Sequence, residues 1–537
     1  MTTANAAAVA AVVRHLDGMA LAVELAAARV PAMTPAELAR RLEHSFAGLA
    51  AGRRGVVARH QTLRAAIDWS FQLLAGPEQV LLARLAVFAG GCTLEAVEEV
   101  CGGEGIDPDT VFELLASLVA RSLVVAEDHG PQTRYRLLET IRQYGEERLE
   151  QAGEADRWRA RHASYYAGLL PRVRDHAHHP KEEVFWAVRL GTEQVVLLAA
   201  WSWAIGSGSV DPAFQILAGF APVEVRSTYS LQLPGEAALE LPGAAEHPGY
   251  PLALAVSPQI ASIRADVTGA EELCGRAADA NAGQATPDWR VEAAVCTARS
   301  NIAASVGAFA DAARLAEQAA GMARAGGDLA DASVGLAYAT SYHMLIDGAA
   351  AAVPLAREAL ALARQIGAPA LVATGLLAVG MAVADADPEK ARDCLRESRE
   401  LSTALGYQSA LDLVWATGIA FLTGDQAATL ELGRVAVRGL QKGGHIRVGI
   451  VLYMIAGAIA ATRPEAAAII LGAAEAYIAA SVGRTQLISL IVTQALGEQR
   501  ARELRARGAG MDWDQAVAYT LAQTTEALNE LQSQTQP

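Results

Sequence analysis

The chain has 537 residues, of which 52% are hydrophobic but only 5% aromatic, and its formal net charge at pH 7 is -15. This length exceeds what one hydrophobic core accommodates, so we expect about two to four domains. An interior rich in alanine and leucine favours an all-α protein, and the excess of acidic residues argues against a general nucleic-acid or anionic-membrane surface.

Neither the cysteines nor the apolar runs are typical of an extracellular or membrane protein. The five cysteines form no CxxC pair, and an odd number in a large acidic chain suits reduced thiols. The longest apolar run, Val448–Ala461, is shorter than the roughly 20 residues that cross a bilayer. We therefore expect a cytoplasmic protein without membrane contact, and a buried helix at this run.

Residues 1–52 contain two helical patterns. The first is expected to end at Pro31, because proline does not continue a helix. The second opens with the capping box from Thr34 to Glu37, in which Pro35 takes the first helical position, and it continues through Leu42.

The segment Arg59–Gly91 predicts two helices joined by a short turn. Gly76 breaks the first helix, and Pro77 occupies the first position of the second, where its missing N–H costs nothing. Because the connection is so short, we expect the two helices to pack against each other. Their apolar stripes comprise Leu63, Ile67, Phe71 and Leu74 in the first helix, and Val80, Leu81, Leu82, Leu85 and Phe88 in the second.

Two further helices and a hairpin complete residues 53–150. Thr93 caps a helix that ends at Gly102, and Asp107 with Pro108 opens another. The β-type runs at residues 123–125 and 135–137 flank a Gly-Pro turn and predict a hairpin. Helices followed by a hairpin predict a winged helix, and a helix from Glu139 to Leu149 follows it.

The charge of this winged helix argues against DNA binding. Residues 53–150 contain 10 basic and 15 acidic residues, and the segment expected to form the third helix, DPDTVFELLASLVARS, has one arginine and three acidic residues. A recognition helix needs cations for phosphates and polar side chains for base edges. A coupling role is therefore favoured, and direct DNA binding by residues 53–150 is the weakest alternative.

Residues 151–251 are predicted to be a helical transition region. Helices are expected from Arg157 to Leu170 and from Glu193 to Trp203, and the proline-rich stretch Pro222–Pro251 is expected to be irregular. Histidines at positions 176, 178 and 179 have no regular metal-ligand spacing, so a solvated loop is favoured over a metal site.

Residues 252–530 repeat a pattern of a small-residue turn followed by a helix. The steps between successive units are 38, 41, 39, 37 and 39 residues, which is typical of an α-solenoid of helix pairs. A plain helical bundle is the alternative. The units begin at Gly269, Gly307, Gly348, Asp387, Gly424 and Arg463.

The spacing of glycine and alanine in these units resembles the second helix of a tetratricopeptide (TPR) repeat. In TPR proteins the first helices line the inner groove, so polar and aromatic residues on the preceding helices are candidate contacts for a ligand or partner. The alternative for each aromatic residue is a place in the seam between helices. The candidates are Arg299, Asn301, Tyr338, Tyr342, His343, Trp415 and Tyr453.

The motifs RHQTLRAAIDWSFQLLAGPEQVLLARLAVFAGG, LLASLVARSLVV and RYRLLETIRQYGEERL also carry a family resemblance. They are similar to the segment that follows the nucleotide-binding domain in bacterial signal-transduction ATPases of the NB-ARC/STAND class, especially LuxR-type and AfsR-type regulators. The resemblance covers residues 14–165. It implies a helical remnant of the ATPase module at residues 1–52, a winged helix that serves as a regulatory lid, and repeats that bind a protein or small-molecule inducer.

The chain departs from this family at the positions that contact nucleotide. Ala20 stands where the GLPLA motif has proline, and Leu138 stands where the family has a phosphate-sensing histidine. The next residue, Glu139, keeps the family's acid but suits the first turn of a helix in any case. No GxxxxGK[ST] motif occurs. We therefore expect no cofactor, and the resemblance implies that the ATPase domain, if encoded, lies upstream of residue 1.

Motifs of enzymatic chemistry are also missing from the sequence, including GxSxG, HExxH and a strand followed by GxGxxG. The sequence thus predicts a non-enzymatic, all-α regulatory protein, with a winged-helix domain followed by a TPR-like α-solenoid. The favoured function is the sensor and scaffold part of a STAND-type transcriptional regulator. The alternative is a free-standing interaction scaffold that acts through the repeats alone.

Overall fold

The computed structural model describes residues 5–15, 33–44, 63–128, 132–176, 178–224, 235–263, 267–405, 410–441, 448–477 and 485–535, and the single residues 23, 27 and 30. The chain divides into two compact units. The first comprises residues 1–169 and 192–212, and the second comprises residues 170–191 and 213–537. The predictions about Ala20, Pro31 and the turn residues 129–131 lie outside the described residues.

The described N-terminal helices are α1 (Ala6–His15) and α3 (Pro35–His44), which contact each other. The predicted capping box opens α3. The Thr34 backbone N–H donates to Glu37 Oε2 at 2.9 Å, and the Glu37 N–H donates to Thr34 Oγ1 at 3.2 Å. Two backbone donors that the helix itself leaves unpaired are thereby satisfied.

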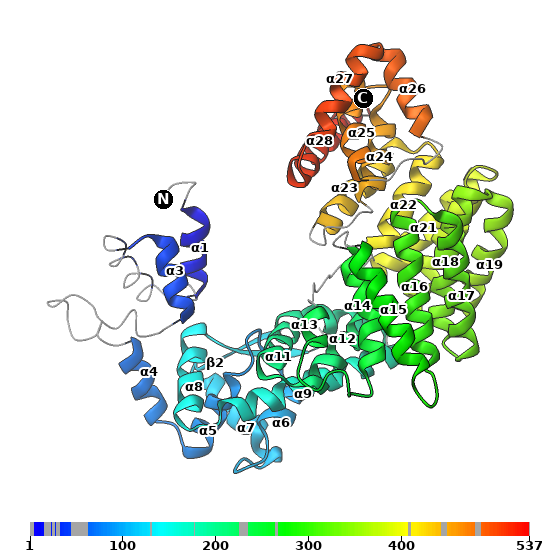
Figure 1. The fold of residues 1–537 in the computed structure, drawn as a ribbon. Helices are drawn as coiled ribbons and strands as arrows, with labels where there is room; N and C mark the ends of the chain where they lie inside the picture. The colour runs from blue at the N-terminus through cyan, green and yellow to red at the C-terminus, as the bar shows by residue number, and fades with distance from the viewer. Residues whose placement is uncertain are drawn as a thin grey trace. The chain divides into compact units, whose positions relative to one another are not determined.

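The winged helix follows with the element order expected for this fold, as Figure 1 shows. Helix α7 immediately precedes the hairpin of β2 and β3. The elements are α4 (Leu63–Gln72), α5 (Gly76–Leu85), β1 (Cys92–Thr93), α6 (Leu94–Cys101), the 3-10 turn η2 (Pro108–Thr110), α7 (Val111–Ala120), β2 (Val124–Asp128), β3 (Thr133–Leu137) and α8 (Glu139–Gln151).

The predicted caps and hairpin are confirmed. Thr93 Oγ1 accepts from the Ala96 N–H at 3.3 Å, and Asp107 accepts from the Asp109 N–H at 3.2 Å. Strands β2 and β3 pair antiparallel, with Val124 opposite Leu137. The sequence did not indicate β1, which pairs antiparallel with β3 to complete a sheet of order β1-β3-β2. A strand of two residues is too short to show period-2 alternation.

One expectation for the opening helices is wrong in detail. Helix α5 ends at Leu85, so Phe88 lies beyond it, although its side chain is only 3% exposed. Helix α8 lies against both α4 and α5. Tyr144 of α8 donates to the Asp68 carboxylate of α4 at 2.6 Å. Gly145 faces α5 so closely that an added Cβ would lie 2.8 Å from that of Ala86. Both helices thus pack on an element distant in sequence, and their contact with each other includes the hydrogen bond from Gln79 of α5 to the Phe71 carbonyl of α4 at 3.0 Å.

The rest of the first unit consists of α11 (Gln194–Ser207) and the N-terminal part of α9 (Ala155–His176). Both agree with the helices predicted for the transition region. The stretch from Pro222 is less irregular than predicted, because α12 (Val210–Glu224) extends into it and α13 (Gly235–Leu239) and the start of α14 lie within it.

The second unit is a series of antiparallel helices in which each helix from α14 to α25 contacts the next (Figure 1). Helix α28 packs back on α23, α24 and α25. Besides the end of α9, the helices of the second unit are α10 (Glu183–Thr192), α12, α13, α14 (Tyr250–Ile263), α15 (Val267–Ala282), α16 (Trp289–Ser305), α17 (Phe309–Ala325), α18 (Leu329–Ile346), α19 (Ala349–Ile366), α20 (Pro369–Val383), α21 (Pro388–Leu405), α22 (Ala410–Leu422), α23 (Gln426–Gln441), α24 (Val448–Ile459), α25 (Pro464–Tyr477), α26 (Thr485–Leu496), α27 (Glu498–Ala509) and α28 (Trp513–Thr535).

The predicted repeats correspond to these helix pairs. Gly307, Gly348 and Gly424 each precede a second helix and have φ of 79°, 76° and 74°, a conformation that favours glycine. Gly269 differs, because it lies inside α15. The chain is thus all-α apart from the small sheet of its winged helix, which is followed by a helical solenoid.

Candidate functional site

Helix α7 occupies the position of the recognition helix in a winged helix. Val111, Leu115 and Leu118 point into the core. The outward face is small, apolar and acidic, and it contains no cation. It comprises Asp109 just before the helix, Phe112, Glu113, Ala116 and Ala120, all exposed. We call these five residues the α7 face.

The cations near this helix are already engaged. Arg121 lies 3.8 Å from Glu78, and Arg136 of β3 donates to Glu127 of β2 at 2.7 Å. A hydrogen bond from Ser117 lowers the pKa of Glu78 more than burial raises it, so this carboxylate stays charged. The described arginines beside α7 and in the hairpin therefore offer little free positive charge for phosphates.

Arg134 of β3 is turned inward and forms a buried ion pair. Its guanidinium donates to Glu193 at 2.9 and 3.1 Å, and it also donates to the Gly91 carbonyl at 3.1 Å. The two side chains are 9% and 1% exposed. Burial lowers the pKa of Arg134, but the hydrogen bond and charge of Glu193 outweigh this and raise it. The pair fixes the hairpin to the start of α11.

The N-terminal part of α9 is fixed to the winged helix by Trp158, which is fully buried. The guanidinium of Arg84 lies 3.8 Å above the Trp158 ring and donates to the carbonyls of Cys101, Gly103 and Glu104 at 2.7–2.8 Å. Arg161 of α9 donates to the Gly102 carbonyl at 2.9 Å. Two arginines thus satisfy carbonyls at the end of α6, and α9 supplies one of them.

A second contact between α9 and the winged helix is an aromatic cluster. Phe88 meets His162 edge-on, with ring centroids 5.2 Å apart, and Tyr166 at 6.3 Å. Burial lowers the pKa of His162 to about 3, so the imidazole is neutral. This cluster explains why Phe88 is buried although α5 has already ended.

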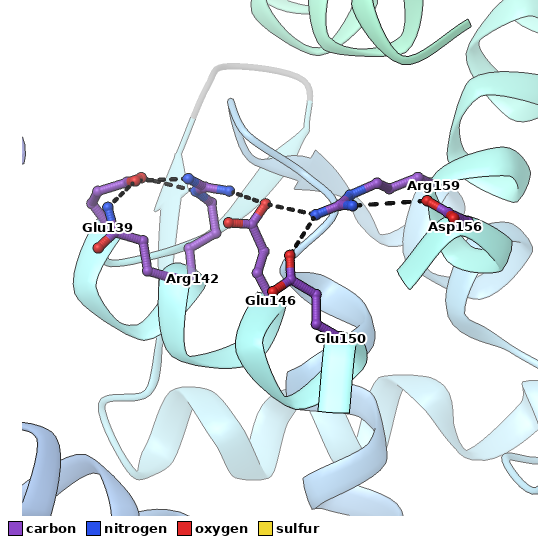
Figure 2. Close-up of polar contacts among 7 residues, drawn as sticks. Glu139, Arg142, Glu146, Glu150, Asp156 and Arg159 are labelled. Carbon is purple, nitrogen blue, oxygen red and sulfur yellow. Dashed lines mark hydrogen bonds and ion pairs between the residues drawn. The ribbon is translucent and has the colours of Figure 1, made fainter. Parts of the chain in front are cut away.

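Charged side chains on α8 and the start of α9 form a surface network, shown in Figure 2. Arg142 contacts Glu139 and Glu146, both at 2.7 Å, whereas Arg159 lies 3.6 Å from Glu150 and 3.9 Å from Glu146. Glu139 therefore has an ordinary role as an ion-pair partner on its own helix. Arg159 also lies 4.0 Å from Asp156, so four acidic residues share two arginines and this surface is also acidic.

The C-terminal part of α9 belongs to the second unit, and it packs on α10. His176 stacks on Trp186 with ring centroids 5.7 Å apart and planes 19° apart. Arg172 and Arg189 approach the same ring at 5.6 and 5.3 Å. His176 also pairs with Glu182 at 2.9 Å. The predicted solvated histidine cluster thus includes one histidine with a defined packing partner.

Helix α10 in turn is anchored on the repeats. The Glu183 carboxylate is 4% exposed and accepts from the Ala370 backbone N–H at 2.9 Å, at the start of α20. Pro180 lies against the turn at Gly367, 3.2 Å from where a Cβ would be. A carboxylate at a helix N-terminus satisfies an unpaired donor and is favoured by the helix dipole. We call this contact the Glu183 anchor.

The structure separates the seven predicted groove residues into two groups by burial. Arg299 pairs with Glu271 at 2.7 Å, Asn301 is half-buried, and His343 bridges Glu317 and Asp347 at 2.8 and 2.7 Å. The aromatic side chains lie in the cores between helices and are 5–7% exposed: Tyr338, Tyr342, Trp415 and Tyr453. A role in ligand contact stays a prediction, and Arg299, Asn301 and His343 have the surface for it.

Two properties of the described residues bear on alternative functions. No cluster of three or more histidine, cysteine or acidic side chains there is arranged to hold a metal ion. None of the described helices is long and apolar enough to cross a membrane.

Comparisons with known proteins point first to the winged helix. A winged helix-turn-helix domain model matches residues 74–150. Rv0890c of Mycobacterium tuberculosis, provisionally named an HTH-type transcriptional regulator, is 46% identical over 219 residues, which are 41% of this chain and 24% of that protein. The uncharacterized protein Mb0918 of Mycobacterium bovis is 38% identical over 181 residues, or 34% of this chain and 43% of that protein. The chain thus spans less than half the length of either relative.

A solved structure with a weaker likeness is PH0952 of Pyrococcus horikoshii, described as a STAND signal-transduction ATPase with a tetratricopeptide repeat sensor. It is 16% identical, with a TM-score of 0.43, and the match covers 95% of this chain and 72% of that one. At that TM-score the likeness supports no further conclusion.

Proposed function

We propose that this chain is the regulatory part of a signal-transduction regulator of transcription. The repeats bind a protein or a small-molecule inducer, and helix α9 transmits that event to the winged helix. The names of the mycobacterial relatives support a transcriptional setting. An ATPase domain, if one is encoded upstream, is the further partner that the sequence resemblance implies.

The observation that supports this proposal is that α9 is fixed at both ends. Trp158, Arg161 and His162 hold its first part on the winged helix. His176 holds its last part on α10, which the Glu183 anchor attaches to α20. A helix anchored in two units transmits a displacement of one to the other.

A proline lies at the point where α9 passes from the first unit to the second. Pro171 is inside the helix, and the units divide between Leu169 and Leu170. Proline lacks the N–H that would bond to the carbonyl four residues earlier, so the helix bends most easily there. We infer that a shift of α20 reaches α9 through Glu183 and changes the bend at Pro171.

The test is to remove the anchor and follow the two units. Fluorophores on unnatural amino acids at Gln151 and Glu389, both exposed, would report the distribution of distances in single molecules of the full chain. Glu183→Ala should broaden that distribution relative to the wild type. Lys181→Ala, an exposed change two residues away, is the matched control and should leave it unchanged. Identical distributions in all three proteins would rule out transmission through Glu183.

DNA binding by the winged helix is the alternative, and the matched domain family and the names of the relatives favour it. The α7 face opposes it, because it contains acidic and apolar side chains where phosphates and base edges would lie. We expect the full chain to show no duplex binding whose affinity falls steeply with added salt. Such a fall, the sign of counterion release, would instead establish the DNA function.

A further inference from the structure

The α7 face differs from an ordinary surface helix in how its residues are grouped. Phe112 is 50% exposed, an unusual state for a phenylalanine side chain. Ala116 and Ala120 follow it at four-residue spacing, so they continue the same face of the helix. The result is an apolar strip with one large side chain at one end and small side chains along the rest.

Within the described part of the chain, the acidic residues beside this strip have no cation to balance them. Asp109 and Glu113 flank Phe112, and Asp107 lies one turn before it. Among the residues that the structure describes, no arginine, lysine or histidine pairs with these three carboxylates, and the hydrogen bond of Asp107 goes to the backbone of Asp109. The neighbouring arginines are committed elsewhere, Arg121 to Glu78 and Arg157 to Glu104.

We propose that the α7 face docks a protein segment in the form of an amphipathic helix whose apolar stripe is flanked by lysine or arginine. This inference rests on the proposed protein-coupling role of the winged helix, and it names the chemistry of the partner. Phe112 enters the partner's apolar stripe, as exposed aromatic anchors do at interfaces. Ala116 and Ala120 let the partner helix approach closely. The basic flanks pair with Asp109 and Glu113.

Charge complementarity selects this occupant over two others. DNA would bring phosphates against three carboxylates that no described cation neutralises, which is unfavourable. A second copy of this chain has a net charge of -15, so its average surface repels the α7 face. A basic segment gains from the same carboxylates, and the apolar strip adds the specificity that charge alone lacks.

The experiment uses the full chain and two labelled peptides of about 18 residues with the same helical pattern. One combines leucine with lysine, and the other combines leucine with glutamate. Fluorescence anisotropy at physiological salt should show binding of the lysine peptide alone. Phe112→Ser should weaken that binding about tenfold, equal to about 1.4 kcal/mol, and Glu113→Lys should weaken it by a similar factor.

The control for general electrostatics is Glu240→Lys, which makes the same change in net charge at an exposed site far along the sequence. It should leave the affinity unchanged. Equal losses in Glu113→Lys and Glu240→Lys, or full binding by Phe112→Ser, would overturn the proposal. So would a dimer of the chain alone that Phe112→Ser dissociates, because the occupant would then be a second copy.

A failure of the docking proposal can be told apart from a failure of the proposed transmission through Glu183. The distance distribution of the Glu183→Ala chain is measured without any partner. Melting temperatures of the variants should equal that of the wild type, because Phe112 and Glu113 point away from the core.

Discussion

In the first unit the largest buried side chains are aromatic and lie beside buried charges, whereas alanine is the commonest buried residue of the repeats. Trp158, Tyr144 and Tyr166 are fully buried; Arg84 lies over the Trp158 ring, and Tyr166 lies close to the ion pair of Arg134 with Glu193. The seams between α17 and α19 are filled by alanines, among them Ala312, Ala316, Ala320, Ala352, Ala356 and Ala359.

Because of this difference, the stability of the two units depends on their core side chains in different ways. A core built on a few large side chains depends strongly on each of them. A core of alanines spreads its stability over many close helix contacts, so the loss of one methyl group matters little, but an added group has nowhere to go. The units should therefore respond to opposite kinds of substitution.

The largest effect is expected from truncating an aromatic residue of the first unit. Phe88→Ala should cost roughly 3–5 kcal/mol, because the ring is buried against His162 and Tyr166. Calorimetry that resolves separate unfolding transitions would show this loss in the first unit only. A cost below about 1 kcal/mol would mean that Phe88 does not support this core.

The repeats should instead be sensitive to enlargement. An added Cβ at Gly472 would lie 2.0 Å from the Arg505 backbone oxygen, so α25 and α27 must separate to admit it. Gly472→Ala should destabilise the second unit by about 3 kcal/mol, the upper end of the usual cost of overpacking.

The matched control is Gly321→Ala, because a Cβ there meets nothing within 4 Å. Gly321 is inside α17, so this change should stabilise the unit by roughly 0.5–1 kcal/mol. Equal effects of the two substitutions would contradict the close contact of α25 with α27.

Acid should weaken the first unit through His162. Burial lowers its pKa to about 3 from an ordinary 6.5, so the unfolded chain takes up a proton that the folded chain excludes. The stabilising effect is present above pH 6.5 and is lost as the pH falls towards 3, by about 2 kcal/mol at pH 5. The melting temperatures of the first unit in wild type and in His162→Gln should converge as the pH falls from 6.5 towards 3. A difference that stays constant over this range would refute the lowered pKa of His162.

A smaller effect of opposite sign is expected in the repeats from His343. Burial alone lowers its pKa, but the hydrogen bonds and charges of Glu317 and Asp347 raise it above 6.5. A neutral imidazole donates only one hydrogen bond, so one carboxylate loses its donor when the ring deprotonates. The contribution is present below pH 6.5 and is lost as the pH rises through the raised value.

Comparison of His343→Gln with wild type checks this second pH effect. The difference in the melting temperature of the second unit should be largest in mild acid and should shrink in mild alkali. A difference that grows with pH would mean that His343 is not held as the cation.

The sequence by itself determined the local features of this protein. Thr93 and the capping box at Thr34 and Glu37 began their helices as predicted, because caps act within one turn of the chain. Pro77 lies in the first turn of α5 but is its second residue, since the helix begins at Gly76, the residue expected to break the preceding helix. Gly307, Gly348 and Gly424 revealed the helix pairs because each marks a turn that depends on its own backbone conformation. The acidic character of α7 was also visible, since charge is a property of the sequence.

Only the tertiary structure decided which residues meet. Burial of Tyr338, Tyr342, Trp415 and Tyr453 followed from packing between helices and was not encoded in their spacing. The Glu183 anchor joins residues 187 positions apart, and the partner of Arg134 is 59 positions away. No short-range pattern specifies such contacts, because their energy comes from groups that the fold alone brings together.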